Sequence, residues 1–189
     1  MKVEVTVTTD AATEPITTAE AKTFLRLDAS TEDTLIDELV SAARRWAEKY
    51  AGVSLTAKTY TALFSELTTY EDEFDLPYSP VASITSVARV DQEGTETTLT
   101  LNDGYYKRGL KDLTIRPVKQ FSTSGYFDSM YKIVYTSDAS LMNEDIKLAL
   151  YKLVADFYEN RQNERDDAIV QINYDSKRIL NRIKKIHFV

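Results

Sequence analysis

Hydrophobic residues repeat with a helical period twice within residues 14–52. A first helix is predicted after Thr17, because Thr17 and Glu20 have the spacing of a capping box, in which each side chain bonds to a backbone N–H of the other residue. A longer helix follows, in which apolar residues recur three and four positions apart until Gly52, a typical residue for a helix C-terminus. Residues 14–52 therefore predict a helical hairpin.

The apolar face of the longer helix is expected to supply half of a helical core. Its charged residues, which include Arg44 and Glu48, fall on the other face. A third helix is predicted over residues 143–162, capped by Asn143, with a second apolar stripe. The core residues predicted from the two stripes are Leu35, Leu39, Trp46, Leu150, Leu153 and Phe157.

The hydrophobic period changes to two between residues 54 and 136, where Thr, Val, Ile, Tyr and Phe are common. The segment "ASITSVARV" alternates apolar with polar residues, and "DQEGTE" has the composition of a hairpin turn. About five to seven short antiparallel strands are expected in this region. A short last helix is predicted in the tail 175–189, and it needs a packing partner because isolated helices of this length are unstable.

These elements predict one α+β domain that spans residues 1–189. Its two N-terminal helices pack with a long C-terminal helix in a helical bundle, and the antiparallel β segment is an insertion between them. Residues 1–15 lack the apolar stretch of a signal peptide, and no apolar run approaches the roughly 20 residues of a membrane span. Neither export nor membrane insertion is expected.

Composition narrows the function without identifying it. Hydrophobic content of 43% and charged content of 28% are ordinary for a globular protein. The formal net charge of −7 argues against a protein that grips nucleic acid by its phosphates. The absence of cysteine excludes disulfides, thiolate zinc sites and cysteine nucleophiles, and it is compatible with a cytosolic protein.

No group of residues in the sequence forms a recognisable catalytic or metal site. The one histidine, His187, lies near the C-terminus, where it is a poor candidate for a general base, so the common nucleophile–base pairs are not available. The acids of "YEDEFD" lack the glycine turn and the distal bidentate acid of a calcium loop. We predict a solvated acidic loop there, with no cofactor and no metal; a glycosidase-type pair of carboxylates is left as an alternative. These acids are Glu71, Asp72, Glu73 and Asp75.

Two segments indicate interaction surfaces. No acidic residue follows Asp175, whereas five basic residues do, so the tail either docks onto an acidic partner or forms a solvated helix end favoured by the helix dipole. The segment 119–130 is rich in aromatic residues, which are typical of interfaces but would equally pack on a sheet. The aromatic residues in and beside this segment are Phe121, Tyr126, Phe127 and Tyr131.

Four short motifs occur in order along the chain. The opening "EPITTAEAKTFLRLD" fits the pattern P-(I/V)-(S/T)-x-x-E-A-K followed by L-R-(L/V)-D, and "AARRWAEKYAG" fits A-A-R-x-(W/Y)-x-E-x-Y-(T/A)-G. Further along, "DLPYSPVASITSV" fits L-P-x-x-P-V-x-S-I-x-S-V, and "LYKLVADFYENR" resembles L-L-x-(A/L)-x-x-(Y/F)-x-x-R without matching every position. In this order the motifs resemble the phage head–tail connector family, the head-completion adaptors of tailed, mostly siphophage-type phages and prophages. The resemblance covers most of residues 14–161, and residues 105–131 and the C-terminus depart from it.

The resemblance implies a structural virion protein rather than an enzyme. Members form a ring of about twelve copies beneath the portal, extend the DNA channel and present a docking surface to the stopper or tail. The implied partners are the portal protein, a stopper or tail-completion protein, further copies of the chain, and genomic DNA that passes without sequence-specific binding. The protein would assemble in the bacterial cytoplasm and lie at the head–tail interface of the virion. Another neck or tail-completion protein, such as a stopper, is the first alternative, and an enzyme with an unrecognised carboxylate site is the second.

The resemblance also implies roles for the two candidate interaction segments. The basic tail is expected to insert into the portal, so that deletion of residues 176–189 leaves a folded protein that no longer binds portal. The segment 119–130 is expected to contact the neighbouring subunit or the next ring. The residues expected to dock on the portal are Lys177, Arg178, Arg182, Lys184, Lys185, His187 and Phe188.

Overall fold

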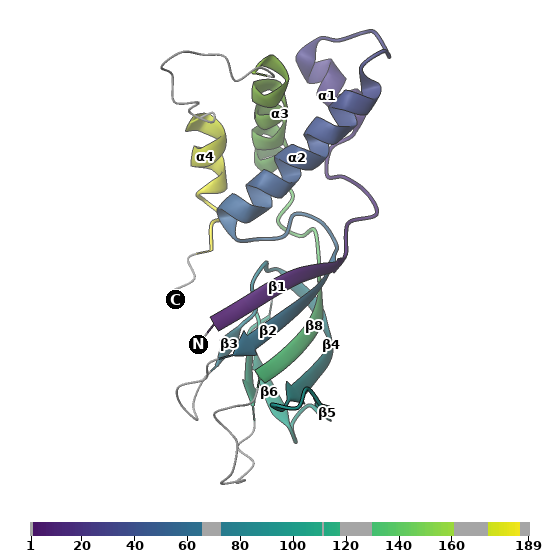
Figure 1. The fold of residues 1–189 in the computed structure, drawn as a ribbon. Coiled ribbons are helices and arrows are strands. Elements are labelled where there is room, and N and C mark those ends of the chain that lie inside the picture. The colour runs from purple at the N-terminus through teal and green to yellow at the C-terminus, as the bar shows by residue number, and fades with distance from the viewer. Residues whose placement is uncertain (1, 66–72, 111, 118–129, 161–173, 186–189) are drawn as a thin grey trace, which may run out of the picture. The chain divides into compact units, whose positions relative to one another are not determined.

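The computed structural model describes residues 2–65, 73–110, 112–117, 130–160 and 174–185. The chain forms two compact units, coloured along the sequence in Figure 1. The helical unit comprises Ala12–Thr56 and Ser140–Ile186, and the β unit comprises Met1–Ala11, Ala57–Ala139 and His187–Val189. In the described part of the chain, no helix combines the length and the apolar character needed to cross a membrane.

Capping groups set the ends of the helices in the helical unit. The Thr17 hydroxyl accepts from the Glu20 N–H at 3.2 Å and the Glu20 carboxylate accepts from the Thr17 N–H at 2.7 Å, which confirms the predicted capping box. Gly52 ends the second helix in the left-handed region, with φ of 68°, and the Asn143 side chain caps the third. The helices in the described residues are α1 (Thr18–Leu25), α2 (Asp33–Ala51), α3 (Glu144–Glu159) and α4 (Tyr174–Leu180).

The core of the helical unit is built mainly from alanine and aliphatic side chains. Helix α2 contributes an alanine-rich line, and α3 contributes larger aliphatic residues opposite it. Small side chains let helix backbones approach closely. The buried apolar residues of α2 are Ile36, Val40, Ala43, Ala47 and Ala51.

The predicted core residues occupy two different positions in this unit. Leu150 and Leu153 of α3 are buried in its centre. Leu35 is half-buried and lies outside the core cluster. The other three pack against the rim of the cluster while partly exposed, because the alanine line of α2 occupies the centre: Leu39, Trp46 and Phe157.

The β unit consists of two antiparallel sheets. The five-stranded sheet has the order β1-β2-β8-β4-β5, and the three-stranded sheet has the order β3-β7-β6. Along β2 and β8 the side chains alternate between buried and half-buried, as the period of two predicts. The strands are β1 (Lys2–Thr9), β2 (Thr59–Ser65), β3 (Phe74–Asp75), β4 (Val81–Val90), β5 (Glu96–Leu99), β6 (Tyr105–Arg108), β7 (Thr114–Pro117) and β8 (Met130–Ser137).

Aromatic side chains fill the core that the two sheets share. The Phe74 ring lies 4.8 Å from the Phe64 ring and 5.0 Å from the Tyr131 ring, measured between centroids, and it is fully buried. Tyr60 stacks on Tyr135 at 5.5 Å. Facing sheets lie roughly 10 Å apart, a gap that large rings span from either side.

The predicted helical bundle with a β insertion is wrong. Helices and strands take similar shares of the described chain, and the strands have a core of their own. Strand β1 precedes the helices and pairs with β2, with Val5 opposite Ala62, so the sheet begins before the hairpin. The long predicted helix is α3, whereas the last helix, α4, has only seven residues. A sheet covered by a second sheet needs no helical layer, which is why the strands form a separate unit.

Candidate functional site

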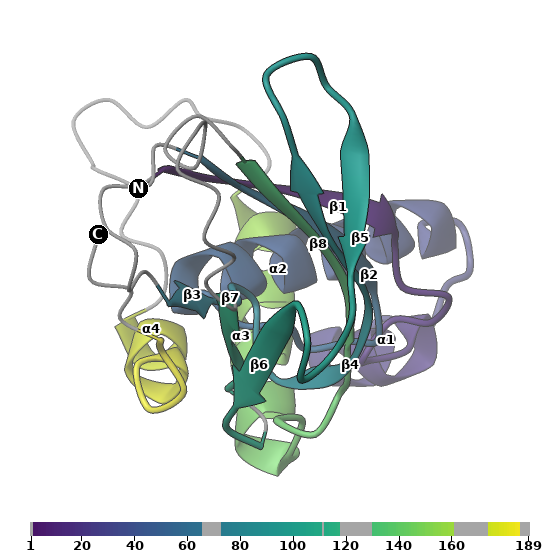
Figure 2. The same ribbon diagram turned by 90° about the horizontal axis from the view of Figure 1, so that it is seen from below.

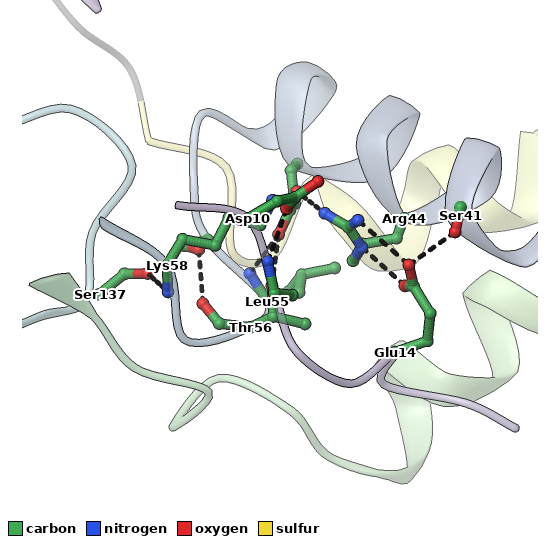
Figure 3. A network of polar contacts seen from close by, with 11 residues as sticks. Asp10, Glu14, Ser41, Arg44, Leu55, Thr56, Lys58 and Ser137 are labelled. Atoms are coloured by element: carbon green, nitrogen blue, oxygen red, sulfur yellow. Dashed lines mark hydrogen bonds and ion pairs between the residues drawn. The ribbon is translucent and has the colours of Figure 1, made fainter. Parts of the chain in front are cut away.

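A buried arginine on α2 lies at the centre of a polar network in the helical unit (Figure 3). The Arg44 side chain is only 3% exposed, and its guanidinium lies between two carboxylates. Its Nε donates to Glu14 Oε2 at 2.6 Å, and its Nη1 donates to Glu48 Oε2 at 3.2 Å. The Ser41 hydroxyl donates to the second Glu14 oxygen at 2.6 Å. Buried charges are costly unless they are paired in this way.

The same network fastens the segment that follows α2. The Leu55 N–H donates to Glu48 Oε1 at 3.0 Å, and the Thr56 hydroxyl lies 3.4 Å from the same oxygen. Glu14 precedes α1, whereas Leu55 and Thr56 follow α2. Arg44 and Glu48 therefore hold both ends of the helical hairpin against two turns of α2.

Sequence periodicity placed Arg44 and Glu48 on the polar face of α2, and the structure buries both. Periodicity cannot separate an exposed Arg–Glu pair at positions i and i+4 from a buried one, because both give the same spacing. One signal was present: Arg44 and Glu48 are the two charged residues that the pattern A-A-R-x-(W/Y)-x-E-x-Y-(T/A)-G specifies, and this pattern carries part of the family resemblance.

The basic C-terminal segment is packed into the helical unit as far as residue 185. Ser176 and Leu180 are fully buried, and the Ser176 hydroxyl donates to the Ala149 carbonyl at 3.1 Å. The Lys185 N–H donates to the Ala51 carbonyl at 2.8 Å. Deletion of residues 176–189 would therefore remove core residues, so it cannot isolate a loss of portal binding.

The basic side chains of this segment differ in exposure and partners. Arg178, Arg182 and Lys184 are exposed, whereas Lys177 and Lys185 are half-buried. Lys184 Nζ lies 4.5 Å from the centroid of the Tyr50 ring, a cation–π contact, and Arg182 lies 3.4 Å from Asp145. The two other residues expected to dock on the portal, His187 and Phe188, lie outside the described residues.

An acid at the start of α4 is neutralised within the same unit. Asp175 Oδ2 accepts from Lys152 Nζ at 2.8 Å. This hydrogen bond and the positive charge of Lys152 lower the pKa of Asp175. The positive character of the segment therefore comes from the residues that follow Asp175.

The aromatic residues expected at a subunit contact cannot all be placed. Tyr131 belongs to β8 and is 2% exposed, so its ring packs inside the β unit and not on a surface. Phe121, Tyr126 and Phe127 lie outside the described residues. Tyr135, four residues further along β8, donates its hydroxyl to the Pro77 carbonyl at 2.5 Å, and burial raises its pKa.

The acids of the predicted acidic loop that the structure describes have partners in the three-stranded sheet. Glu73 pairs with Arg108 at 3.0 Å, and Asp75 accepts from the Thr114 hydroxyl at 2.8 Å. Glu71 and Asp72 lie outside the described residues. Among the residues that are described, no group of three or more acids or histidines is arranged to hold a metal ion.

The fold and the site together define an α+β protein of two units. The buried Arg44 forms ion pairs within the helical unit, and the ring of Phe74 packs within the β unit. The chain belongs to the head completion protein family, because the sequence model of that family matches residues 14–185. This match confirms the resemblance drawn from the four sequence motifs.

Solved structures show the same fold over nearly the whole chain. A chain from the neck of an empty GTA particle, computed with C6 symmetry, superposes with a TM-score of 0.75 at 20% identity, covering 98% of this chain and 97% of that one. A chain from the virion of a native gene transfer agent (GTA) particle gives 0.76 at 19% identity, with the same coverage. A chain from the neck of a native GTA particle, computed with C12 symmetry, gives 0.68 at 17% identity and covers 100% and 98%. No curated protein matches the chain significantly.

Proposed function

We propose that the protein is a structural component of the virion neck, which forms a ring beneath the portal, extends the DNA channel and presents a docking surface to the stopper or tail. The observation that carries this proposal is the family match over residues 14–185, together with a shared fold along almost the full length of chains from virion necks. The buried Arg44 network fits this role, because its charges pair with one another and stabilise the fold.

A ring is supported by the symmetry of the similar necks. Those necks were computed with C6 and C12 symmetry, and a closed cyclic assembly joins copies by head-to-tail contacts between two different surfaces. We propose the same arrangement here, with about twelve copies. The net charge of −7 gives such a ring an acidic character, and an acidic channel wall would let DNA slide without binding it. A ring in which the acidic residues face outward would contradict this channel wall.

The experiment is deletion of the gene in the phage or prophage that encodes it. We expect DNA-filled heads without tails, and restoration of tailed virions when the full chain is supplied from a plasmid. Cryo-electron microscopy of the restored necks should show the chain between the portal and the next neck component. Density that contacts the tail but not the portal would indicate the stopper-like alternative, and normal tailed virions after deletion would refute the proposal.

A further inference from the structure

Two stretches of the helical unit carry opposite charge. The acidic stretch, residues 26–38, contains five acidic residues and one basic residue. The basic stretch, residues 175–185, contains five basic residues and one acidic residue. Both stretches are fully described by the structure and belong to the same unit.

The two stretches lie on opposite sides of the helical unit. The acidic stretch runs from the end of α1 into the first turns of α2, and the basic stretch is α4 with the residues after it. In Figure 1 and in the perpendicular view of Figure 2, α1 and α4 lie on either side of α3. The stretches therefore cannot neutralise each other within one copy.

Much of the charge on each side points to solvent. Asp28, Asp37 and Glu38 are exposed in the acidic stretch, where Asp33 is paired with Lys22 at 2.6 Å. In the basic stretch, Arg178 and Lys184 are exposed, and Arg182 is paired with Asp145 across to α3. After these internal pairs each side keeps a surplus of its own sign.

We propose that the basic stretch of one copy docks on the acidic stretch of the next copy in the ring. This inference rests on the proposed function, because it assigns the partner of both surfaces within that ring. A cyclic assembly needs two different, complementary surfaces on separate sides of the subunit, whereas a two-fold dimer would need both stretches on one side. The acidic and basic stretches lie on opposite sides of the helical unit, so they can serve as the two complementary surfaces of a cyclic assembly. Repulsion disfavours contact between two acidic stretches or two basic stretches.

The contact should be sensitive to salt. Exposed ion pairs are individually weak and are screened within about 8 Å at physiological ionic strength, so this contact selects the partner and its orientation more than it supplies affinity. The acidic stretch also offers the half-buried Leu35, which lies outside the core of its own copy. Docking of the next copy would cover this side chain.

The first test uses the absence of cysteine from the chain. Virions are assembled in the deletion strain with the double variant Glu38→Cys, Arg178→Cys and are then oxidised. We expect a ladder of cross-linked multimers, and none with the matched pair Thr97→Cys, Arg178→Cys, whose first site is exposed on β5. Absence of a ladder from tailed virions, or a cross-link from residue 178 to portal, overturns this contact while the proposed function stands.

The second test exchanges the charges and so does not depend on oxidation. Arg178→Glu and Glu38→Arg should each lower the yield of tailed virions, by about tenfold, because each places like charges opposite one another at every contact around the ring. The combined variant should recover most of the loss, because it restores an opposite-charge pair with its sign reversed. Lys107→Glu, the same charge change at an exposed site on β6, should have little effect. No recovery in the combined variant overturns the contact, whereas failure of the unaltered chain to restore tails would count against the proposed function itself.

Discussion

The helical unit and the β unit of this chain are held together by different kinds of side chain. The buried cluster of the helical unit contains only alanine and aliphatic residues, and its buried charges pair with one another around Arg44. The buried cluster of the β unit contains six aromatic residues among its thirteen members. Close helix packing favours small side chains, and facing sheets favour large ones, so one sequence satisfies both by changing composition at the boundary.

The difference gives each unit its own point of weakness. The stability of the β unit depends on how well its aromatic rings fill the gap between two sheets. Its free energy of unfolding should therefore fall most when buried side-chain volume is removed. The stability of the helical unit depends on a guanidinium that lies between two carboxylates. Its free energy of unfolding should therefore fall most when one partner of these ion pairs is removed. The single tryptophan, Trp46 of α2, reports on the helical unit by its fluorescence, and hydrogen exchange followed by mass spectrometry reports on each unit separately.

The largest effect is expected from Phe74→Ala in the β unit. The ring is fully buried between Phe64 and Tyr131, and its removal leaves a cavity that the two sheets cannot close. We expect a loss of about 4 kcal/mol in the free energy of unfolding of the β unit, measured by hydrogen exchange in urea. Tyr106→Ala, which truncates a side chain that is 48% exposed, should cost less than about 0.5 kcal/mol. Similar losses for the two variants would contradict an aromatic core.

The second effect tests the buried charges of the helical unit. Arg44→Met keeps most of the side-chain volume but leaves Glu14 and Glu48 without their central cation. We expect a loss of about 3 kcal/mol in the free energy of unfolding reported by Trp46 fluorescence. Arg45→Met is the matched control, because Arg45 is the next residue of α2 and is exposed. The double variant Arg44→Met, Glu48→Gln should recover part of the loss, because it removes the unpaired charge while the amide oxygen can still accept from the Leu55 N–H. A double variant less stable than Arg44→Met alone would argue against charge pairing.

Local chemistry explains which parts of the fold the sequence predicts. The helical hairpin, the Thr17 capping box and the Gly52 stop depend on neighbouring residues, and the structure contains all three. Strand β1 was missed, although Val3, Val5 and Val7 alternate with polar residues as a strand requires. It is an edge strand with most of its side chains exposed, so no long-range burial pattern marks it.

Contacts between residues far apart in the sequence explain why the partners of several polar side chains could not be predicted. Nothing in the spacing of Arg44 and Glu48 shows that Glu14, thirty residues away from Arg44, completes their network. Likewise, the basic C-terminal segment looks like a free tail, because the residue that receives its Ser176 hydroxyl bond is Ala149, 27 residues earlier. The side chains were therefore identifiable by type, but their partners were not.

The third effect asks whether the basic segment is part of the helical unit in solution. Leu180→Ala removes a fully buried side chain of α4, and we expect a loss of about 2.5 kcal/mol in the free energy of unfolding of the helical unit. Arg178→Ala, on the exposed side of the same helix, should leave stability within about 0.5 kcal/mol. Hydrogen exchange of the α4 peptide gives the measurement. An unchanged stability in Leu180→Ala would mean that the segment is not part of the helical core in solution.

The smallest effect concerns the first turn of α1 and depends on pH. Hydrogen bonds from the Thr17 backbone N–H, and then from the Thr17 hydroxyl, lower the pKa of the Glu20 carboxyl below its ordinary 4.5, and the charge of Lys147 acts in the same direction. Because the folded state has the lower pKa, ionised Glu20 stabilises it above about pH 4.5, and this contribution is lost as pH falls through the lowered pKa.

Glu20→Gln keeps a capping side chain but not the charge. The side chain is 40% exposed and its charge is screened by solvent, so we expect a loss of only about 0.5 kcal/mol at pH 7. Measured by Trp46 fluorescence in urea between pH 7 and pH 3, this loss should shrink as pH falls through the lowered pKa. Glu93→Gln, the same change at an exposed turn of the β unit, is the matched control and should leave the Trp46 unfolding transition unchanged. A deficit of Glu20→Gln that persists unchanged at pH 3 would mean that the helical unit uses this residue for its shape and not for its charge.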